Sequence, residues 1–301
     1  MVAFVAASPP SGPSAWLLAM RPKTLSLSMV PVVLGTAIAW SEAGRVSWLA
    51  ALVALLGAMA IQIGSNLYND AADYERGGDG PDRQGPLRAT AAGLLTASQV
   101  KRGALACFGF ATLAGLALIC IGGWPILVLG ALSLVAAWGY TGGPYPIAYT
   151  PLGEMFVLAF FGLGAVAGTD WLHTGNLSSA ALLGGIAVGL FASAVLLVNN
   201  HRDALVDRRV GRRTLAIVAG PGLTPWLYAL LVLAPFALLP LIDRRLPGGH
   251  AWLAFGALPL AIHMLLRFAR VPRGPAFNRI LAQTAQLQLA FGLLLCLGLV
   301  L

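Results

Sequence analysis

The sequence has 301 residues, of which 58% are hydrophobic and only 10% are charged, and its mean hydropathy is +0.81. This composition excludes a water-soluble globular fold, because repeated apolar runs approach the length of about 20 residues that crosses a bilayer. The net charge of +8 does not indicate a nucleic-acid partner, because the basic residues gather at alternate ends of these runs.

Nine such runs follow one another along the chain. They are continuous rather than alternating, and backbone groups in hydrocarbon must be hydrogen-bonded internally, so the sequence predicts an all-α polytopic membrane protein and not a barrel. The predicted spans are 15–40, 46–68, 100–121, 124–140, 151–170, 178–200, 215–242, 250–270 and 280–301. We expect residues 1–14 to form a flexible tail and residues 15–301 to form a single transmembrane domain.

The distribution of basic residues predicts the orientation in the membrane. If the N-terminus is cytoplasmic, 16 of the 19 Lys and Arg residues fall in cytoplasmic segments, and only Arg45, Arg244 and Arg245 lie outside. The sequence therefore predicts a multi-pass protein of the cytoplasmic (inner) membrane whose C-terminus lies on the outer side. Its surroundings are the lipid bilayer, and no obligate protein partner is evident.

The end of the second span carries an unusual gathering of acids in "SNLYNDAADYERGGDGPDRQGPLRAT", residues 65–90. Asn66, Asn69, Asp70 and Asp73 are spaced i, i+3, i+4 and i+7, which places them on one face of a helix. Carboxylates at membrane depth are costly and usually mark a substrate or ion site, so this face is a candidate functional site.

A second polar face ends the sixth span in "LLVNNHRDALVDRRVGRRTLA", where Asn199, Asp203 and Asp207 are spaced i, i+4 and i+8. The pattern Asn-x-x-x-Asp recurs at an offset of 133 residues, and a basic segment follows each copy. We therefore predict that the two Asp-rich motifs, at the ends of helices 2 and 6, face each other across a central cavity that opens to the cytoplasmic side.

These residue types indicate a particular chemistry. Asp and Asn oxygens without His or Cys suit Mg²⁺, which shares its coordination with substrate phosphate, while nearby arginines neutralise the remaining phosphate oxygens. The candidate metal ligands are Asn69, Asp70, Asp73, Asp79, Asn199, Asp203 and Asp207. The candidate diphosphate-binding residues are Lys23, Arg83, Arg88, Arg212 and Arg213. In a membrane-embedded site, we expect the diphosphate to belong to a lipid.

Both motifs carry a family resemblance. "NDAADYERGGDGPDRQGPLR" and "NNHRDALVDRRVGRRTLA" resemble the Asp-rich motifs of the UbiA-type intramembrane aromatic prenyltransferases. The resemblance extends to "RPKTL" before the first span, to the nine-span count and to "GYTGGPYPIAYTPLGE" between the fourth and fifth spans. The motifs are most similar to the branch that prenylates 1,4-dihydroxy-2-naphthoate in menaquinone biosynthesis.

One position departs from the family pattern. An Asp is expected four residues after Asp73, and this sequence has Gly77 there, with Asp79 and Asp82 farther on. We favour Asp79 as the replacement.

The resemblance implies a reaction. Mg²⁺ held by both motifs would draw electron density from a polyprenyl diphosphate, and the acceptor ring would capture the allylic cation with loss of carbon dioxide, giving demethylmenaquinone. Asp73, Asp203 and Asp207 would be the catalytic residues. The candidate acceptor-binding residues are Arg21, Arg202, His201, Tyr140, Tyr145 and Tyr149. Arg21, Arg202 and His201 are alternatives for the carboxylate of the acceptor, and the tyrosines could instead form an interfacial aromatic belt.

Parts of the same pattern occur in proteins with other functions. Within the family, the acceptor could be 4-hydroxybenzoate, homogentisate or haem. A cation-coupled transporter would also place Asp and Asn in the membrane, although here the acids lie at helix ends and are mixed with arginines. The CDP-alcohol phosphotransferases are disfavoured, because their Asp-Gly-x-x-Ala-Arg string does not occur in the sequence.

Overall fold

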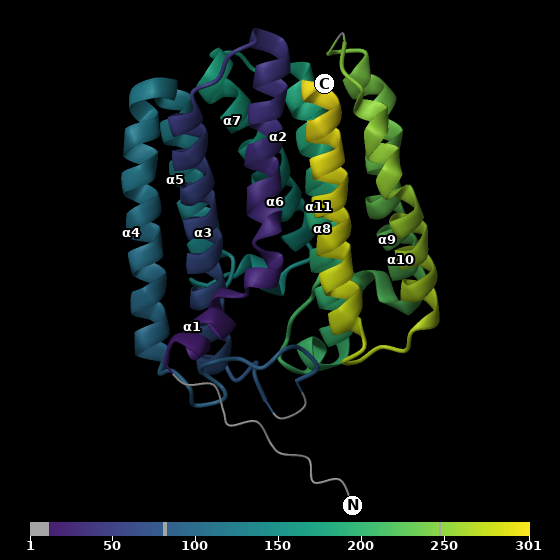
Figure 1. The fold of residues 1–301 in the computed structure, drawn as a ribbon. Helices are drawn as coiled ribbons and strands as arrows, with labels where there is room; N and C mark the ends of the chain where they lie inside the picture. The colour runs from purple at the N-terminus through teal and green to yellow at the C-terminus, as the bar shows by residue number, and fades with distance from the viewer. Residues whose placement is uncertain (1–11, 81–82, 247) are drawn as a thin grey trace, which may run out of the picture.

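The computed structural model describes residues 12–80, 83–246 and 248–301, and the regular elements in these residues are all helical (Figure 1). The α-helices are α1 (Pro13–Met20), α2 (Ser26–Ala43), α3 (Trp48–Glu75), α4 (Ala97–Gly122), α5 (Trp124–Gly139), α6 (Gly153–Val157), α7 (Ala165–Thr174), α8 (Ser179–Arg209), α9 (Leu215–Asp243), α10 (Leu258–Arg270) and α11 (Phe277–Val300). The 3₁₀-helices are η1 (Pro22–Thr24), η2 (Ile147–Tyr149) and η4 (Ala251–Ala257), and η3 (Leu158–Gly164) is a π-helix that joins α6 to α7.

The helices are long enough and apolar enough for a membrane fold, as predicted. Within the described residues, eight segments have spanning length: α2, α3, α4, α6 to α7, α8, α9, η4 to α10, and α11. The remaining predicted span, 124–140, corresponds to α5, an apolar helix of 16 residues that packs against α3 and α4. The count of nine spans therefore stays a prediction for that segment.

The first predicted span, 15–40, is wrong as a single helix. Arg21 adopts a left-handed conformation with φ 55°, and the structure divides this region into α1, η1 and α2. The physical reason is Pro22, which disfavours a helical conformation in the residue before it and cannot donate a backbone hydrogen bond. The predicted tail, 1–14, ends inside α1, and its residues 1–11 lie outside the described part of the chain.

Capping side chains fix where three cavity-forming helices begin. The Ser47 hydroxyl accepts a hydrogen bond from Ala50 N at the start of α3, and Ser178 does the same for Ala181 N at the start of α8. Thr96 forms a capping box with Gln99 at the start of α4. Because these ends are fixed, the helical register of the Asp residues at the far ends of α3 and α8 is fixed as well.

The π-helix η3 lies directly against α8. A Cβ atom built on Gly162 would overlap the carbonyl oxygen of Gly185 and lie 2.7 Å from the Cα of Gly189, so the backbones approach too closely for a side chain at this position. The close approach lets the wide π-helical turn carry Phe160 and Phe161 into the cavity wall.

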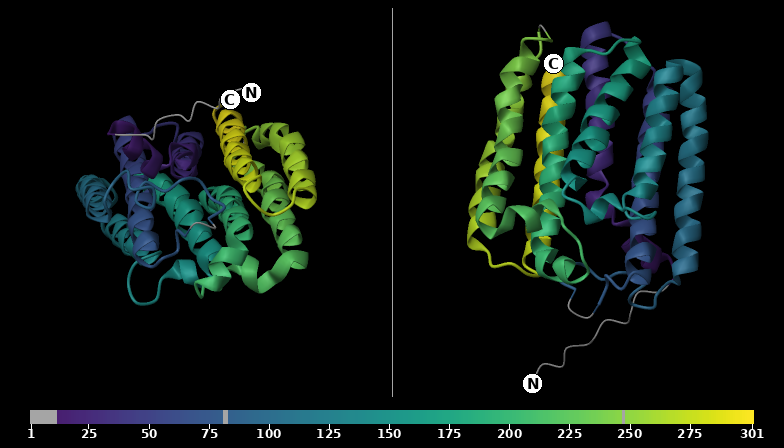
Figure 2. Two further views of the ribbon diagram at one scale, coloured as in Figure 1. Left: turned by 90° about the horizontal axis from the view of Figure 1, so that it is seen from below. Right: turned by 180° about the vertical axis from the view of Figure 1, so that it is seen from behind.

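The apolar core is concentrated on one side of the bundle. Its largest cluster joins buried residues of α8, α9, α10 and α11 with α2, whereas the clusters around α3, α4 and α5 are small. Seen from below, α3, α4 and α5 lie on one side, α9, α10 and α11 on the other, and α2, α7 and α8 between them (Figure 2). The cavity described below lies on the loosely packed side.

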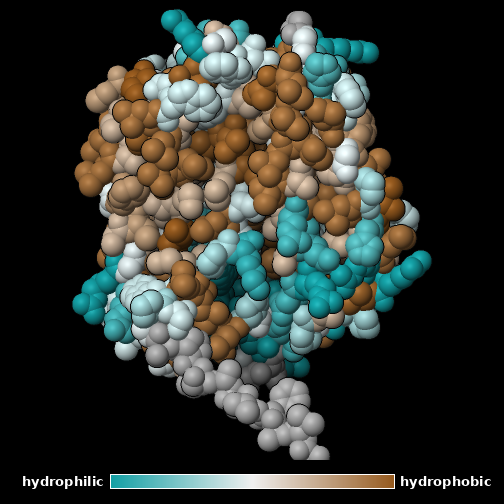
Figure 3. Space-filling view, viewed as in Figure 1, coloured by the Kyte–Doolittle hydropathy of each residue, from teal (hydrophilic) through white to brown (hydrophobic). Residues whose placement is uncertain are grey.

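The face of the bundle seen in Figure 3 is apolar over its middle part, with a polar rim at the top and a broader polar region toward the lower end. The lower end holds the segment between α3 and α4 and the segment between α8 and α9, each of which carries basic residues (Figure 1). Figure 1 places the C-terminus at the opposite end.

The arrangement generates a topology prediction. Ala92 and Asn176 are both exposed, but Ala92 lies between α3 and α4, at the polar end, and Asn176 lies between α7 and α8, at the other. In a variant lacking the native cysteines, we expect Asn176→Cys to react with an impermeant thiol reagent in intact cells and Ala92→Cys to be protected. Inverted vesicles should reverse the pattern, and labelling of Ala92→Cys from outside would refute the orientation.

Candidate active site

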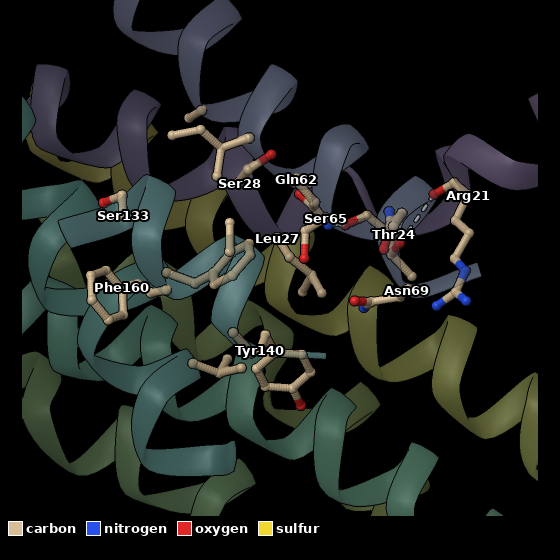
Figure 4. A pocket seen from close by; sticks show the side chains of 18 of the residues that line it. Arg21, Thr24, Leu27, Ser28, Gln62, Ser65, Asn69, Ser133, Tyr140 and Phe160 are labelled. Carbon is tan, nitrogen blue, oxygen red and sulfur yellow. Dashed lines mark hydrogen bonds between the residues drawn. The ribbon is translucent and has the colours of Figure 1, made fainter. Parts of the chain in front are cut away.

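A cavity of about 970 Å³ opens among η1, α2 to α8 and α11. Polar residues such as Arg21, Thr24 and Asn69 line one end, and Phe160 and Leu27 lie toward the other (Figure 4). The cavity therefore combines a charged region with an apolar chamber.

The first Asp-rich motif is centred on Asp73, which is buried near the C-terminal end of α3. Arg88 Nη2 donates to Asp73 Oδ2 at 2.7 Å, and Arg212 Nη2 donates to Asp73 Oδ1 at 2.5 Å. One carboxylate thus holds two guanidinium groups, one from each Asp-rich segment of the chain.

Asp79 is brought back to this motif by a turn that begins where α3 ends. Gly77 has φ 73°, which glycine adopts without strain, so position 77 lies beyond the helix and could not continue its polar face. Arg88 then joins Asp79 to Asp73, with its Nε lying 3.5 Å from Asp79 Oδ1, and Arg83 also donates to Asp79. Asp79 Oδ2 is buried without a partner in the described structure, whereas Asp82 lies outside the described residues.

Asp70 is engaged differently from the expected metal ligand. Its two carboxylate oxygens accept hydrogen bonds from Ala89 N at 3.1 Å and Thr90 N at 3.0 Å. Asp70 therefore fastens the segment between α3 and α4 onto α3, although it also lines the cavity.

The second motif lies on α8 and is held by Arg202. Arg202 Nε and Nη2 donate to the two oxygens of Asp203 at 2.9 and 2.5 Å, and Nη2 also donates to Asn199 Oδ1. Arg202 Nη1 donates to Asn278 Oδ1 of α11 at 2.7 Å. The guanidinium of Arg202 is therefore engaged at all three nitrogens.

Arg212 joins the two motifs across the cavity. Besides Asp73, it contacts Asp207 through Nη1 at 3.2 Å, and its guanidinium carbon lies 4.8 Å from the centre of the Tyr149 ring. Burial alone would lower the pKa of Arg212, but the charges of Asp73 and Asp207 raise it above the ordinary value. A positive group is therefore stabilised at the point where the acids of both motifs meet.

A group of cations lines the same end of the cavity: Arg21, Lys23, Arg83 and Arg88. Burial, together with the positive charges of Arg88 and Arg83, lowers the pKa of Arg21 to about 9. Arg21 Nη2 and Arg88 Nη1 are buried without partners in the described structure. Crowded, incompletely paired arginines of this kind are stabilised when an anion enters between them.

The donor chemistry fits a hard divalent cation. Asp73, Asp203 and Asp207 line the cavity, and Asp79 presents a buried oxygen without a partner beside them. In the described residues, no three Asp, Glu, His or Cys side chains form a ready-made metal cluster. Guanidinium groups lie between the carboxylates instead, at places where the local charge favours a cation.

Comparison with known proteins identifies the family. The sequence profile of the UbiA prenyltransferase family matches residues 28–297. The chain belongs to this family. It is 37% identical, over 94% of both chains, to the 1,4-dihydroxy-2-naphthoate octaprenyltransferase of Escherichia coli (strain K12). It is 36% identical to the enzyme of the same name from Mycobacterium tuberculosis (strain ATCC 25618 / H37Rv), over 82% of this chain and 83% of the relative.

Solved structures of the UbiA family share the fold at low sequence identity. The UbiA homolog from Archaeoglobus fulgidus bound to DMAPP and Mg²⁺ superimposes with a TM-score of 0.63, at 14% identity, over 94% of this chain and 99% of the other. The apo UbiA homolog from Aeropyrum pernix K1 gives a TM-score of 0.67, at 16% identity, over 91% and 96% of the two chains.

The remaining predicted site residues of this UbiA-family protein divide into two groups. Tyr140 lines the cavity. Tyr145 is 90% exposed, and Arg213 is exposed with its backbone N–H donating to Tyr149 O. His201 is buried on another side of α8, between Phe268 and Phe277, where Arg273 Nε donates to its Nε2. The structure does not bring His201, Tyr145, Tyr149 or Arg213 to the cavity wall.

Sequence reasoning missed the role of Arg76, which was not among the predicted site residues. Its guanidinium donates to the carbonyl oxygens of Thr141 and Gly143, and it lies 5.8 Å from the Tyr149 ring centre. Thr141 in turn donates to Asn69 of the first motif. Arg76 therefore fastens the segment between α5 and α6 over the motif, and only its position beside the motif could have suggested this.

Arg76 gives a second prediction. Arg76→Gln removes both hydrogen bonds to the 140–149 segment, so we expect its amides to exchange several-fold faster, including Ala148 N–H, which donates to Tyr140 O. Hydrogen–deuterium exchange with mass spectrometry measures this. Arg102→Gln is the matched control, because Arg102 is exposed and bonds only within α4, to Ser98 O. Equal exchange in the two variants would show that Arg76 does not hold the segment.

Proposed function

We propose that this protein transfers a polyprenyl group from a polyprenyl diphosphate to 1,4-dihydroxy-2-naphthoate, with loss of carbon dioxide, giving demethylmenaquinone. The observation that carries the proposal is a cavity whose apolar chamber ends at two Asp-rich motifs joined by Arg212. The acceptor is chosen on the relatives from E. coli and M. tuberculosis, which are named 1,4-dihydroxy-2-naphthoate octaprenyltransferases and match most of this chain.

Mg²⁺ is the proposed cofactor, held by Asp73 and Asp79 of the first motif and by Asp203 and Asp207 of the second. When bound, it would supply positive charge that stabilises the departing diphosphate. Support comes from the oxygen-only donor set and from the A. fulgidus structures described as bound to DMAPP or GPP and Mg²⁺.

The arginines of the site can pair either with the Asp carboxylates or with phosphate oxygens. Without diphosphate, Arg88 and Arg212 neutralise Asp73. With the diphosphate bound, we propose that these two and Arg83, with Lys23 at the rim, neutralise phosphate oxygens that the metal does not reach. Asp70 would act by holding the segment that carries Arg88, rather than by binding metal.

The apolar chamber provides the remaining requirement of the reaction. Phe156, Phe160 and Phe161 line it together with leucines of α4 and α5. Such a wall accommodates the polyprenyl chain and excludes water, which would otherwise capture the allylic cation. Aromatic faces also stabilise a nearby positive charge.

The carboxylate of the acceptor needs a cation, and Arg21 suits this role better than Arg202. Arg202 already uses all three nitrogens for Asp203, Asn199 and Asn278. Arg21 Nη2 is buried without a partner in the described structure and lines the cavity. We therefore propose that Arg21 binds the carboxylate of the acceptor. We also propose that the motifs, which would bind the charged groups of both substrates, lie on the cytoplasmic side of the inner membrane.

The metal proposal predicts that Asp73→Asn and Asp203→Asn each reduce turnover by roughly 100-fold or more, because each removes a negatively charged ligand of the metal that stabilises the departing diphosphate. EDTA should likewise abolish the activity of the parent protein. The matched control is Glu75→Gln on the same helix, whose exposed carboxylate pairs with Lys101 outside the cavity. Transfer of a labelled prenyl group in isolated membranes measures the three variants and the EDTA-treated parent protein. Full activity in EDTA would refute the metal.

The choice of acceptor predicts the fate of one carbon atom. With 1,4-dihydroxy-2-naphthoate labelled at the carboxyl carbon, we expect the label to leave as carbon dioxide only when polyprenyl diphosphate and Mg²⁺ are both present. Prenylation of 4-hydroxybenzoate would instead keep its carboxylate. Trapped gas and the mass of the lipid product are the measurements, and a prenylated lipid that retains the label would contradict the decarboxylating reaction.

A further inference from the structure

Glu154 is a buried carboxylate that the functions assigned above do not use. It lies in the first turn of α6 and is only 4% exposed. Asn200 Nδ2 donates to Glu154 Oε1 at 2.9 Å, and Ser193 Oγ donates to the backbone oxygen of Glu154 at 2.7 Å. Glu154 Oε2 is buried without a partner in the described structure. Burying a carboxylate at this depth costs free energy, so its presence usually marks a functional role.

Asn200 connects this carboxylate to the cavity. It lines the cavity and stands on the same face of α8 as Asp203 and Asp207, at spacings i, i+3 and i+7. It therefore lies three residues, roughly 4.5 Å, farther along the helix from the charged end than Asp203. That level is immediately beyond the charged end, where the chamber turns apolar.

The pairing with Glu154 sets which end of the Asn200 amide faces the cavity. A carboxylate only accepts hydrogen bonds, so it must face the NH₂ group, and the carbonyl oxygen Oδ1 is the end that remains for the cavity. Tyr140 lies at the same place, since a Cβ atom built on Gly153, next to Glu154, would be 3.3 Å from the Tyr140 hydroxyl. The cavity wall here presents a neutral acceptor oxygen beside a phenol.

A neutral acceptor oxygen selects its ligand by chemistry. It repels the oxygens of a diphosphate or a carboxylate, offers nothing to a hydrocarbon chain, and binds a hydroxyl group that donates. If the proposed function holds, the carbon that leaves the diphosphate lies at this depth, and the aromatic ring must reach it there. The ring of 1,4-dihydroxy-2-naphthoate carries two hydroxyl groups.

We propose that Asn200 Oδ1 accepts a hydrogen bond from a ring hydroxyl of the aromatic acceptor, and that Glu154 is the positioning residue that holds the amide in this orientation. The inference rests on the proposed function, and it adds a subsite for the hydroxyl at the end of the ring away from Arg21. Glu154 acts only through Asn200 and makes no contact with substrate.

The test compares inhibitors that differ by one hydroxyl group. 2-Naphthoate, 1-hydroxy-2-naphthoate and 4-hydroxy-2-naphthoate are each titrated against prenylation of labelled 1,4-dihydroxy-2-naphthoate. In the parent protein we expect 4-hydroxy-2-naphthoate, whose hydroxyl lies away from the carboxylate, to inhibit about 5- to 10-fold more strongly than 2-naphthoate. This ratio is the hydroxyl advantage, and a general loss of folded protein does not change it.

Two variants should remove the advantage: Asn200→Ala, which deletes the acceptor oxygen, and Glu154→Leu, which leaves the amide free to turn. The KM for the acceptor should rise in both, while the KM for the polyprenyl diphosphate stays within about 2-fold. The exchanged pair Glu154→Gln with Asn200→Asp should recover the advantage. In that pair the amide on α6 donates to the carboxylate on α8, and the carboxylate still leaves an oxygen facing the cavity.

Ser193→Ala is the matched control, since it removes a buried hydrogen bond to the same Glu154 without touching its carboxylate. It should keep the advantage even if stability falls. An unchanged ratio in Asn200→Ala and Glu154→Leu, or no recovery in the folded exchanged pair, overturns the proposal. Failure of the proposed function would show differently, as absence of prenylated naphthoate from the parent protein.

Discussion

Charge balance inside an apolar bundle is the constraint on which the site depends, and the guanidinium of Arg212 meets it by contacting Asp73 and Asp207 at once. Leaving either carboxylate buried without a partner would cost about 3–5 kcal/mol. Because Asp73 belongs to α3 and Asp207 to α8, the same contact holds together helices that are far apart in the sequence. The two motifs therefore form one site.

The same constraint explains how the segments at the polar end of the bundle are held. Arg88 can reach Asp73 only because Asp70 binds the backbone at Ala89 and Thr90, which folds the chain after α3 back onto that helix. Arg76 fastens the segment after α5 from the other side. The site is thus closed from below by arginines that hold backbone and carboxylate groups, while the apolar chamber above it is shaped by helix packing.

The two sides of the bundle differ in packing: one side has a continuous apolar core, and the other encloses the cavity. The helices α8 to α11 share a continuous core, in which aromatic rings such as Phe191, Phe236 and Phe291 pack against one another. The helices α3 to α5 contact each other through two smaller clusters of buried residues and line the cavity. A rigid half can support α8, which carries the second motif, while the open half accepts the substrates.

The sequence alone determined the membrane class, the helical fold and the two polar helix faces, because hydropathy and a spacing of 3 to 4 residues are local properties of the chain. It also singled out Asp79, which the structure joins to Asp73 through Arg88. The break at Arg21 was readable from Pro22 but was missed, since the apolar run continues on both sides of it.

Tertiary structure decided which of these residues meet. His201 and Asp203 are two positions apart, yet α8 turns His201 toward Phe268 and Phe277 and Asp203 toward the cavity. Arg202 donates hydrogen bonds to its neighbour Asp203, whereas Arg21 keeps a buried nitrogen without a partner in the described structure. Spacing along a helix fixes a face, but the direction in which that face points, and the charges that oppose it, depend on helices distant in the sequence.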